Sequence, residues 1–259
     1  MVNIALVVEY DGSKFFGFQK QKENFRTIQE ELEKSLSKFA NHEINIVTAG
    51  RTDTGVHAFF QVVNFKTDAK RKLYGWVCGV NSLLPEDIVI REAVIVPDEF
   101  DARYSAISRS YKYYLLQDRV ASAIFRGNLG LYYLNLDLKS MQDACEYIVG
   151  RHDFSAFRAS DCQANTPIRD LTNVSISSRD NLLCFEFTAN AFLYHMIRNI
   201  MGALVYVGAG KLSITGFNEL LLSKNRVKAP PTFMPDGLYL SYVQYKEKYF
   251  SYTPKVYLL

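Results

Sequence analysis

The chain has 259 residues, of which 48% are hydrophobic and 22% are charged, and its formal net charge is +3. A chain of this length and composition can bury one large core or two moderate ones, which excludes a disordered protein. The N-terminus lacks a basic region and no apolar run approaches the ~18 residues of a membrane span, so we expect a cytoplasmic protein without a membrane segment. The four cysteines and four histidines show no ligand spacing, so we expect no disulfide framework and no metal site.

The first part of the chain shows alternating, helical and turn patterns in a regular order. A capping-box pattern, Thr27 followed by Glu30, opens the first helix, and Pro85 ends the second. The predicted elements are a strand at Asn3–Glu9, a loop at Asp11–Arg26, a helix that continues to Phe39, strands at Ile44–Ala49 and Phe59–Lys66, a helix at Leu73–Leu84 and a strand at Asp87–Val96. The order β-α-β-β-α-β is the ferredoxin-like plan.

The second part of the chain repeats this order without obvious sequence repetition. The turn residues Arg179, Asp180 and Asn181 predict a hairpin between two of its strands. The predicted elements are strands at Arg109–Gln117, Asp170–Ser177, Leu182–Asn190 and Leu238–Tyr245, and helices at Leu138–Val149, Phe192–Val207 and Ile214–Leu222.

These patterns predict an α/β protein of the α+β type with two tandem halves. We expect domains at residues 1–104 and 105–259, each with a ferredoxin-like or RRM-like βαββαβ plan. Together the halves are predicted to form a mixed, mainly antiparallel sheet with a central cleft. Ligands favour such junctions, so a loop of the first half would need partners from the second.

The stretch from Gly50 to His57 places one carboxylate, Asp53, between two of the predicted strands. Gly55 can hinge the turn and Arg51 supplies a positive charge near the acid, which would favour its ionised form. Such an Asp is a plausible nucleophile or base. Asp-x-Gly between strands is also a common turn sequence, so this pattern alone leaves both interpretations open.

The charge is unevenly distributed. Residues 1–104 carry 13 Lys and Arg against 15 Asp and Glu, a net −2, and residues 105–259 carry 17 against 12, a net +5. Attraction to phosphates would therefore depend on local clusters such as Lys14, Lys20, Lys22 and Arg26, each of which could equally be a solvated face. The 17 Tyr and 18 Phe suit base stacking and a β-rich core equally well.

A series of motifs runs along nearly the whole chain. They are Tyr10-Asp11-Gly12, Gly17-Phe18-Gln19-Lys20-Gln21, Ala49–His57, Asn81-Ser82-Leu83-Leu84-Pro85, Phe100-Asp101-Ala102-Arg103, Arg109-Ser110-Tyr111-Lys112-Tyr113, His152–Phe157, Phe192–Asn199 and Gly237-Leu238-Tyr239-Leu240. In this order they resemble the tRNA pseudouridine synthase A family. The chain departs from the family pattern at Phe18, where Trp is frequent, at Thr54, where Ala is common, and at Asp101, where His is frequent.

The resemblance implies an isomerase that converts uridine to pseudouridine without a cofactor. It makes Asp53 the catalytic carboxylate, with attack at C1′, attack at C6 and a glycal route all open. It implies Arg198 as the cation beside Asp53, Tyr111 as the ring that stacks on the uracil, and Arg51 as an RNA contact. Leu238 is implied as a wall of the pocket.

The resemblance also implies the partners of the protein. The substrate would be tRNA, modified at positions 38, 39 and 40 of the anticodon stem-loop, and the target nucleotide would leave the stack for the reaction. Lys14, Lys20, Lys22 and Arg26 would contact the RNA. Members of the family pair as homodimers, and two copies would double the positive charge available to a large polyanion.

Two alternatives remain beside this hypothesis. The βαββαβ order is also that of an RRM, which would make the chain a non-catalytic RNA-binding protein; the predicted strand Phe59–Lys66 does not match the RNP1 pattern of such domains. A pseudouridine synthase that acts on another RNA site would show the same motifs, because RNA geometry selects the site.

Overall fold

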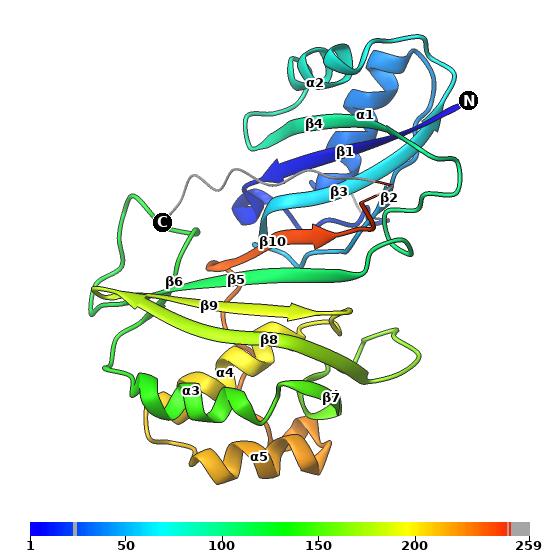
Figure 1. Cartoon of the computed structure of the whole chain (residues 1–259). Helices are drawn as coiled ribbons and strands as arrows, with labels where there is room; N and C mark the ends of the chain where they lie inside the picture. The colour runs from blue at the N-terminus through cyan, green and yellow to red at the C-terminus, as the bar shows by residue number, and fades with distance from the viewer. Residues whose placement is uncertain (23–24, 248, 250–259) are drawn as a thin grey trace. The chain divides into compact units, whose positions relative to one another are not determined.

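The computed structural model describes residues 1–22, 25–247 and 249 (Figure 1). Contacts divide the chain into two compact units. Unit 1 comprises Met1–Ile107 and Tyr239–Leu259, and unit 2 comprises Ser108–Leu238. The predicted domains, 1–104 and 105–259, differ from this division because the last strand groups with the first unit.

Unit 1 has the ferredoxin-like order that the sequence predicts. Its elements are β1 (Val2–Tyr10), α1 (Ile28–Ala40), β2 (Val47–Thr48), β3 (His57–Thr67), α2 (Leu73–Asn81) and β4 (Ile88–Val96), with a 3-10 turn at Gly12–Lys14 and the added strand β10 (Leu238–Gln244). Thr27 caps α1 as predicted, because its hydroxyl accepts a hydrogen bond from the Glu30 backbone.

The sheet of unit 1 runs in the order β4-β1-β3, and β1 is antiparallel to both of its neighbours. Two strands, β2 and β10, share the other edge of β3. Antiparallel β2 pairs with Asn64 and Val63 at one end, and parallel β10 pairs with His57 and Ala58 at the other. At the end of β3 that follows the Asp53 loop, Ala58 pairs with Tyr10 of β1 on one side and with Leu240 of β10 on the other.

Aromatic rings join the helices of unit 1 to its sheet. The Trp76 ring of α2 lies edge-on to Phe39 of α1 and to Phe65 of β3, with centroids 5.1 Å apart in both pairs. Trp76 and Phe65 are buried. Burying rings of this size is a main contribution to the stability of a unit this small.

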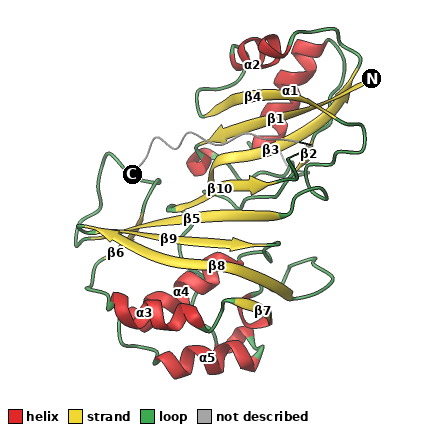
Figure 2. Ribbon diagram, viewed as in Figure 1, coloured by secondary structure: helices red, strands yellow, loops and turns green. Residues whose placement is uncertain are grey.

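Unit 2 contains a second set of mainly antiparallel strands and three helices that lie together beside it (Figure 2). Its elements are β5 (Ser108–Gln117), β6 (Gly130–Tyr132), α3 (Leu138–Glu146), β7 (Gly150–Asp153), β8 (Ile168–Arg179), β9 (Leu182–Ala189), α4 (Met196–Gly208) and α5 (Ile214–Ser223), with 3-10 turns at Ser155–Phe157 and Arg226–Lys228. The order across the sheet is β5-β9-β8-β7, and β6 pairs with β5. Asp180 adopts a positive φ of 54° in the predicted hairpin.

The fold class is confirmed, because both units combine helices with a mainly antiparallel sheet. The predicted closing strand of the second half does not stay there, since its residues from Tyr239 on group with unit 1, where they pair with β3. The predicted central cleft stays a prediction.

Several predicted ends of helices and strands were wrong for local reasons. Residues 44–49 form only a two-residue strand, because side chains of α1 accept two of their N–H groups: Ser37 that of Ile44 and Glu33 that of Ile46. Helix α4 begins at Met196 instead of residue 192, after His195 in a left-handed conformation. Helices α2 and α3 end at Asn81 and Glu146, and the short strands β6 and β7 were not predicted.

Candidate active site

The Asp53 loop, residues 49–56, connects β2 to β3 in unit 1. Its turn closes when the Val56 N–H donates to the carbonyl oxygen of Asp53 at 3.1 Å, and Gly55 accepts the required φ of 77°. The Asp53 side chain is half-buried, whereas Arg51 and Thr54 on either side are exposed. This places a carboxylate at the surface of a closed turn.

Buried groups anchor the loop from three sides. The Phe18 N–H donates to the Thr52 carbonyl oxygen at 3.0 Å, and the hydroxyls of Tyr10 and Thr52 lie 2.8 Å apart. Gln61 of β3 donates its side-chain amide to the Gly50 carbonyl oxygen at 2.7 Å. Burial raises the pKa of Tyr10 to about 12, so its hydroxyl stays protonated and able to hydrogen-bond at neutral pH.

Two glycines allow residues 11–18 to lie against the Asp53 loop. A Cβ on Gly17, whose φ is 85°, would sit 3.0 Å from the Thr52 carbonyl oxygen and 3.4 Å from the Asp53 carbonyl carbon. A Cβ on Gly12 would overlap the Val56 carbonyl oxygen. The two motifs that the sequence separates by about thirty residues are therefore one packed unit.

Fully buried His57 lies where the Asp53 loop enters β3. Its Nδ1 atom is 3.1 Å from the backbone nitrogen of Gly12 and 3.1 Å from an Asp11 carboxylate oxygen. The hydrogen bond with His57 holds the pKa of Asp11 well below its usual value. The imidazole stacks on the Tyr239 ring of β10 with centroids 4.5 Å apart, so His57 of β3 joins residues 11–12 to β10.

The supporting roles of Tyr10, His57 and Gln61 were not predicted from the sequence. The sequence did contain one indication of these roles. His57 and Gln61 are polar residues in a buried strand, and buried polar groups need hydrogen-bond partners. These partners come from distant parts of the chain, which periodicity does not reveal.

Arg198 lies on α4 of unit 2, half-buried. Its Nε donates to the Phe233 carbonyl oxygen at 2.9 Å, and the Phe233 N–H donates back to the Arg198 carbonyl oxygen at 3.1 Å. Burial raises the pKa of Tyr113, the negative charge of Asp236 raises it further, and the positive charge of Arg198 lowers it. Asp236 is thus an acid in the same neighbourhood.

Tyr111 and Leu238 are also buried residues. Tyr111 of β5 is 8% exposed, pairs with Phe187 of β9, and lies edge-on to the Phe192 ring at 5.1 Å. Leu238 is the first residue of β10, and its N–H donates to the Pro235 carbonyl oxygen. The structure places Asp53 and Arg51 in unit 1 and Tyr111, Arg198 and Leu238 in unit 2. The pairing of Asp53 with Arg198 stays a prediction.

The predicted basic cluster contains two kinds of residue. Lys14, Lys20 and Lys22 are exposed. Arg26 binds Asp87 through two hydrogen bonds of 2.8 and 2.9 Å, contacts Glu31 at 3.3 Å, and lies over the Phe15 ring. Because Arg26 is held by two acids, its positive charge is already compensated.

The departures from the family pattern have simple structural consequences. The Asp101 carboxylate accepts the N–H groups of Arg103 and Tyr104, both at 2.8 Å, and so caps a turn. Phe18 is buried 6.2 Å from the Tyr10 ring, and Thr54 is exposed. In the part of the chain that the structure describes, no three His, Cys, Asp or Glu residues form a group that could hold a metal ion, and no helix is long and apolar enough to cross a membrane.

Comparison with known proteins explains the shared motifs. A family profile described as tRNA pseudouridine synthase matches residues 6–105 and 144–246, which include the Asp53 loop and α4. This chain belongs to that tRNA pseudouridine synthase family. Its similarity to individual members of the tRNA pseudouridine synthase family extends over almost the whole chain.

Three relatives carry the name tRNA pseudouridine synthase A. The one from Chromobacterium violaceum is 49% identical over 96% of this chain and 95% of its own length. The one from Neisseria meningitidis serogroup C is 46% identical over 97% and 95%, and the one from Nitrosomonas europaea is 49% identical over 96% and 91%. A solved archaeal box H/ACA sRNP Nop10–Cbf5 complex aligns with a TM-score of 0.37 and 11% identity over 78% of this chain and 43% of that one. This alignment adds nothing to the family assignment.

Proposed function

We propose that this protein converts uridine to pseudouridine in tRNA, at positions 38, 39 and 40 of the anticodon stem-loop. The observation that carries the proposal is the family match across both units, with relatives named tRNA pseudouridine synthase A at 46% to 49% identity. The Asp53 loop lies inside the matched residues, held by buried polar partners.

The reaction breaks the N1–C1′ bond of uridine, turns the base and joins C5 to C1′; C5 loses a proton and N1 gains one, so the product is an isomer of the substrate. It requires neither a redox change nor a group donor. We assign to Asp53 the carboxylate that attacks C1′, attacks C6 or removes the 2′ proton. Each of these steps needs the ionised form and a position that does not move, which the anchored turn supplies.

The other assigned residues have supporting roles. Arg198 would keep the reacting carboxylate charged, because a nearby cation favours the ionised form. Tyr111 would stack on the extruded uracil, and its hydroxyl could accept the C5 proton. Exposed Arg51 would contact the RNA backbone, and Leu238 would line the pocket. The three exposed lysines Lys14, Lys20 and Lys22 would add phosphate contacts, whereas Arg26 would hold their loop through Asp87.

We expect the enzyme to recognise the shape of its RNA substrate more than the base sequence. C1′ of a stacked nucleotide is out of reach, so the target base must leave the helix. An RNA stem shows few base edges to a protein, so contacts fall mainly on phosphates and 2′-hydroxyls. An enzyme that reads the backbone in this way can modify neighbouring uridines in one stem.

The test is a reaction with unmodified tRNA in buffer without cofactors, followed by mapping of pseudouridine at nucleotide resolution. We expect modification at positions 38 to 40 and none with Asp53→Asn. Pseudouridine confined to other positions or another RNA would contradict the site assignment. Tight RNA binding without any pseudouridine would indicate a binding protein.

We also propose that the enzyme acts in the cytoplasm as a homodimer that shares each tRNA between subunits. The segment between β5 and β6 exposes Val120, Ile124 and Phe125, and Tyr133 directly after β6 is exposed as well; a second copy could cover these apolar side chains. A chain with Asp53→Asn is mixed with a chain in which Lys14, Lys20 and Lys22 are changed to Gln. Recovered activity in the mixture supports sharing, whereas a fully active monomer in sedimentation contradicts the dimer.

A further inference from the structure

Residues 229–237, which we call the strap, connect the 3-10 turn at Arg226–Lys228 to β10 and lie against α4 in unit 2. Phe233 of the strap pairs with Arg198 in both directions. Its carbonyl oxygen accepts the Arg198 Nε–H at 2.9 Å, and its N–H donates to the Arg198 carbonyl oxygen at 3.1 Å. A Cβ on Gly202, one turn later in α4, would overlap the carbonyl oxygen of Pro231. The strap therefore packs directly on the turn of α4 that carries Arg198.

Arg226 joins the strap to α4 through its two terminal nitrogens. One of them donates to the carbonyl oxygens of Ala229 at 3.2 Å and Pro230 at 3.1 Å. The other donates to the side-chain oxygen of Asn199 and to the hydroxyl of Thr232, both at 3.1 Å. The Thr232 hydroxyl in turn donates to the same Asn199 oxygen at 2.7 Å. One guanidinium group thus bonds to three residues of the strap and to one residue of the helix.

This network lies next to the contact that orients Arg198. Asn199 directly follows Arg198 in the chain, and Thr232 directly precedes Phe233. Asn199 is fully buried, and its side-chain nitrogen donates to the Phe157 carbonyl oxygen at 2.8 Å, so the helix end of the network is fixed. A shift of the strap along α4 would move the carbonyl oxygen that accepts the Arg198 Nε–H.

Arg226 is a half-buried cation that no carboxylate of the described chain accompanies. Burial lowers its pKa, whereas Arg26 in unit 1 is held by two acids. A cation that loses water and gains only neutral oxygens is costly for stability. Costs of this kind concentrate at functional sites, where a fixed geometry is needed.

The other end of the strap is bonded to β5, the strand of Tyr111. The Tyr113 hydroxyl donates to the Met234 carbonyl oxygen at 3.0 Å, and the Tyr114 N–H donates to the Gly237 carbonyl oxygen at 2.8 Å. A Cβ on Gly237 would overlap the Tyr114 carbonyl oxygen. The strap therefore links α4 to the strand that carries Tyr111.

We propose that Arg226 is a positioning residue for the reaction: it fixes the strap on α4, so that the Phe233 carbonyl oxygen holds the Arg198 guanidinium in one orientation. The proposal rests on the proposed function, which assigns Arg198 to the reacting carboxylate. Arg226 has an internal role, because four oxygens of the protein engage its terminal nitrogens. A group that is already oriented needs no rearrangement during the reaction, so loss of Arg226 should lower turnover and leave tRNA binding unchanged.

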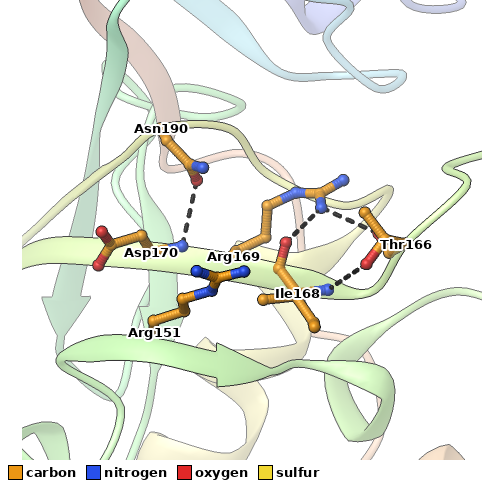
Figure 3. A pocket seen from close by; sticks show the side chains of 6 residues that line it. All are labelled: Arg151, Thr166, Ile168, Arg169, Asp170 and Asn190. Atoms are coloured by element: carbon orange, nitrogen blue, oxygen red, sulfur yellow. Dashed lines mark hydrogen bonds between the residues drawn. The ribbon is translucent and has the colours of Figure 1, made fainter.

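The orientation of Arg198 is measured by the exchange of its Nε–H with solvent in ¹⁵N NMR spectra of the full-length protein, with Arg198→Ala to assign the signal. Arg169→Gln is the matched control for Arg226→Gln. Arg169 is a buried arginine of unit 2, and one of its terminal nitrogens donates to the carbonyl oxygens of Thr166 at 2.9 Å and Ile168 at 2.6 Å (Figure 3). We expect exchange of the Arg198 Nε–H to be roughly tenfold faster in Arg226→Gln and unchanged in Arg169→Gln.

Pseudouridine formation in unmodified tRNA is measured on the same preparations. Arg226→Gln should lower kcat at least about tenfold without a change in KM for tRNA, and Arg226→Lys should do the same, because it retains the charge but loses the guanidinium fork. Added to Arg198→Ala, Arg226→Gln should cause no further loss of kcat, since it acts through Arg198. Arg169→Gln should keep kcat within a few-fold even where urea unfolding shows an equal loss of stability.

Three results would overturn the positioning role. The first is unchanged exchange of the Arg198 Nε–H in Arg226→Gln. The second is a loss of kcat in Arg226→Gln no larger than that in Arg169→Gln. The third is weaker tRNA binding with a smaller salt slope in Arg226→Gln and normal binding in Arg226→Lys, which would make Arg226 a phosphate contact.

Failure of the proposed function gives a different result. In that case the unchanged protein forms no pseudouridine in tRNA at saturating concentration. The exchange measurement requires no substrate, so it decides independently whether Arg226 holds Arg198 in place.

Discussion

The backbone N–H of Phe18 donates a hydrogen bond of 3.0 Å to the carbonyl oxygen of Thr52, the residue directly before Asp53. A further bond from Tyr10 and one from Gln61 fix the same loop. The position of the carboxylate is therefore set by residues 10–18 as much as by its own turn. Changes in that distant segment should alter the reaction without removing any assigned catalytic group.

Gly17→Ala tests this dependence. The new methyl group would meet the Thr52 carbonyl oxygen and the Asp53 backbone while strained at a φ of 85°. Gly210→Ala is the matched control, because Gly210 also has a positive φ, 68°, but open space where the Cβ would lie. Both changes should cost about 1 kcal/mol of folding stability through backbone strain. Only Gly17→Ala should lower kcat, by tenfold or more, in a single-turnover assay; equal kcat values would contradict the role of the packed segment.

The role of Arg198 is tested against that of its acidic neighbour Asp236. If Arg198 acts on the reacting carboxylate, Arg198→Ala should lower kcat by about a hundredfold or more while Asp236→Asn leaves kcat within a few-fold. If the two residues form only a structural pair, both variants should lose similar stability and similar activity. Urea unfolding and steady-state kinetics on the same preparations distinguish these results.

Tyr111 is expected to act through its ring. Tyr111→Phe should keep substrate affinity, whereas Tyr111→Leu should weaken it by roughly 1–3 kcal/mol, as is typical of base–aromatic stacking. A loss of kcat in Tyr111→Phe alone would show that the hydroxyl takes part in proton removal. Tyr113→Phe is the control on the same strand: it loses the hydrogen bond to Met234 and about 1 kcal/mol of stability, with kcat unchanged. If Tyr111→Leu binds and reacts normally, the ring is only part of the core.

We expect Asp11 to make a pH-dependent contribution to the free energy of unfolding. Its pKa is held below the usual value by His57, so its stabilising effect is complete above about pH 4 and decreases as the pH falls below that value. Asp11→Asn should therefore lower the free energy of unfolding at pH 7 by about 1 kcal/mol or less, because its side chain is 43% exposed and solvent screens the charge. Urea titrations between pH 7 and pH 3 should show the difference shrinking at the acid end. Asp161→Asn, an exposed carboxylate in unit 2, should change little at any pH.

The sequence predicted most of the architecture because its signals were local. The capping box at Thr27, the alternation in β1 and β3 and the hairpin at Asp180 each depend on residues close in the chain. The grouping of β10 with unit 1 was missed, because pairing with β3 joins residues almost two hundred positions apart. Helix α4 was predicted too long, since residues 192–194 continue its apolar pattern while the left-handed backbone of His195 separates them from the helix.

The candidate site was predicted less completely. The catalytic role of Asp53 stays a prediction from its turn and from the family motifs, and neither indicates that Tyr10, Gln61 and Phe18 would anchor the loop. Arg26 was grouped with three lysines by charge alone, and its pairing with Asp87 depends on a residue 61 positions away. Side-chain partners of this kind depend on tertiary structure.

The central claim is that the Asp53 carboxylate carries the chemistry. It is tested most directly by release of tritium from C5-labelled uridine in tRNA, measured for the unchanged protein and for Asp53→Asn, which retains the size of the side chain. We expect no detectable release from Asp53→Asn, together with unchanged tRNA affinity and unchanged unfolding. Release within tenfold of the unchanged protein, about 1.4 kcal/mol in the activation barrier, would contradict the claim.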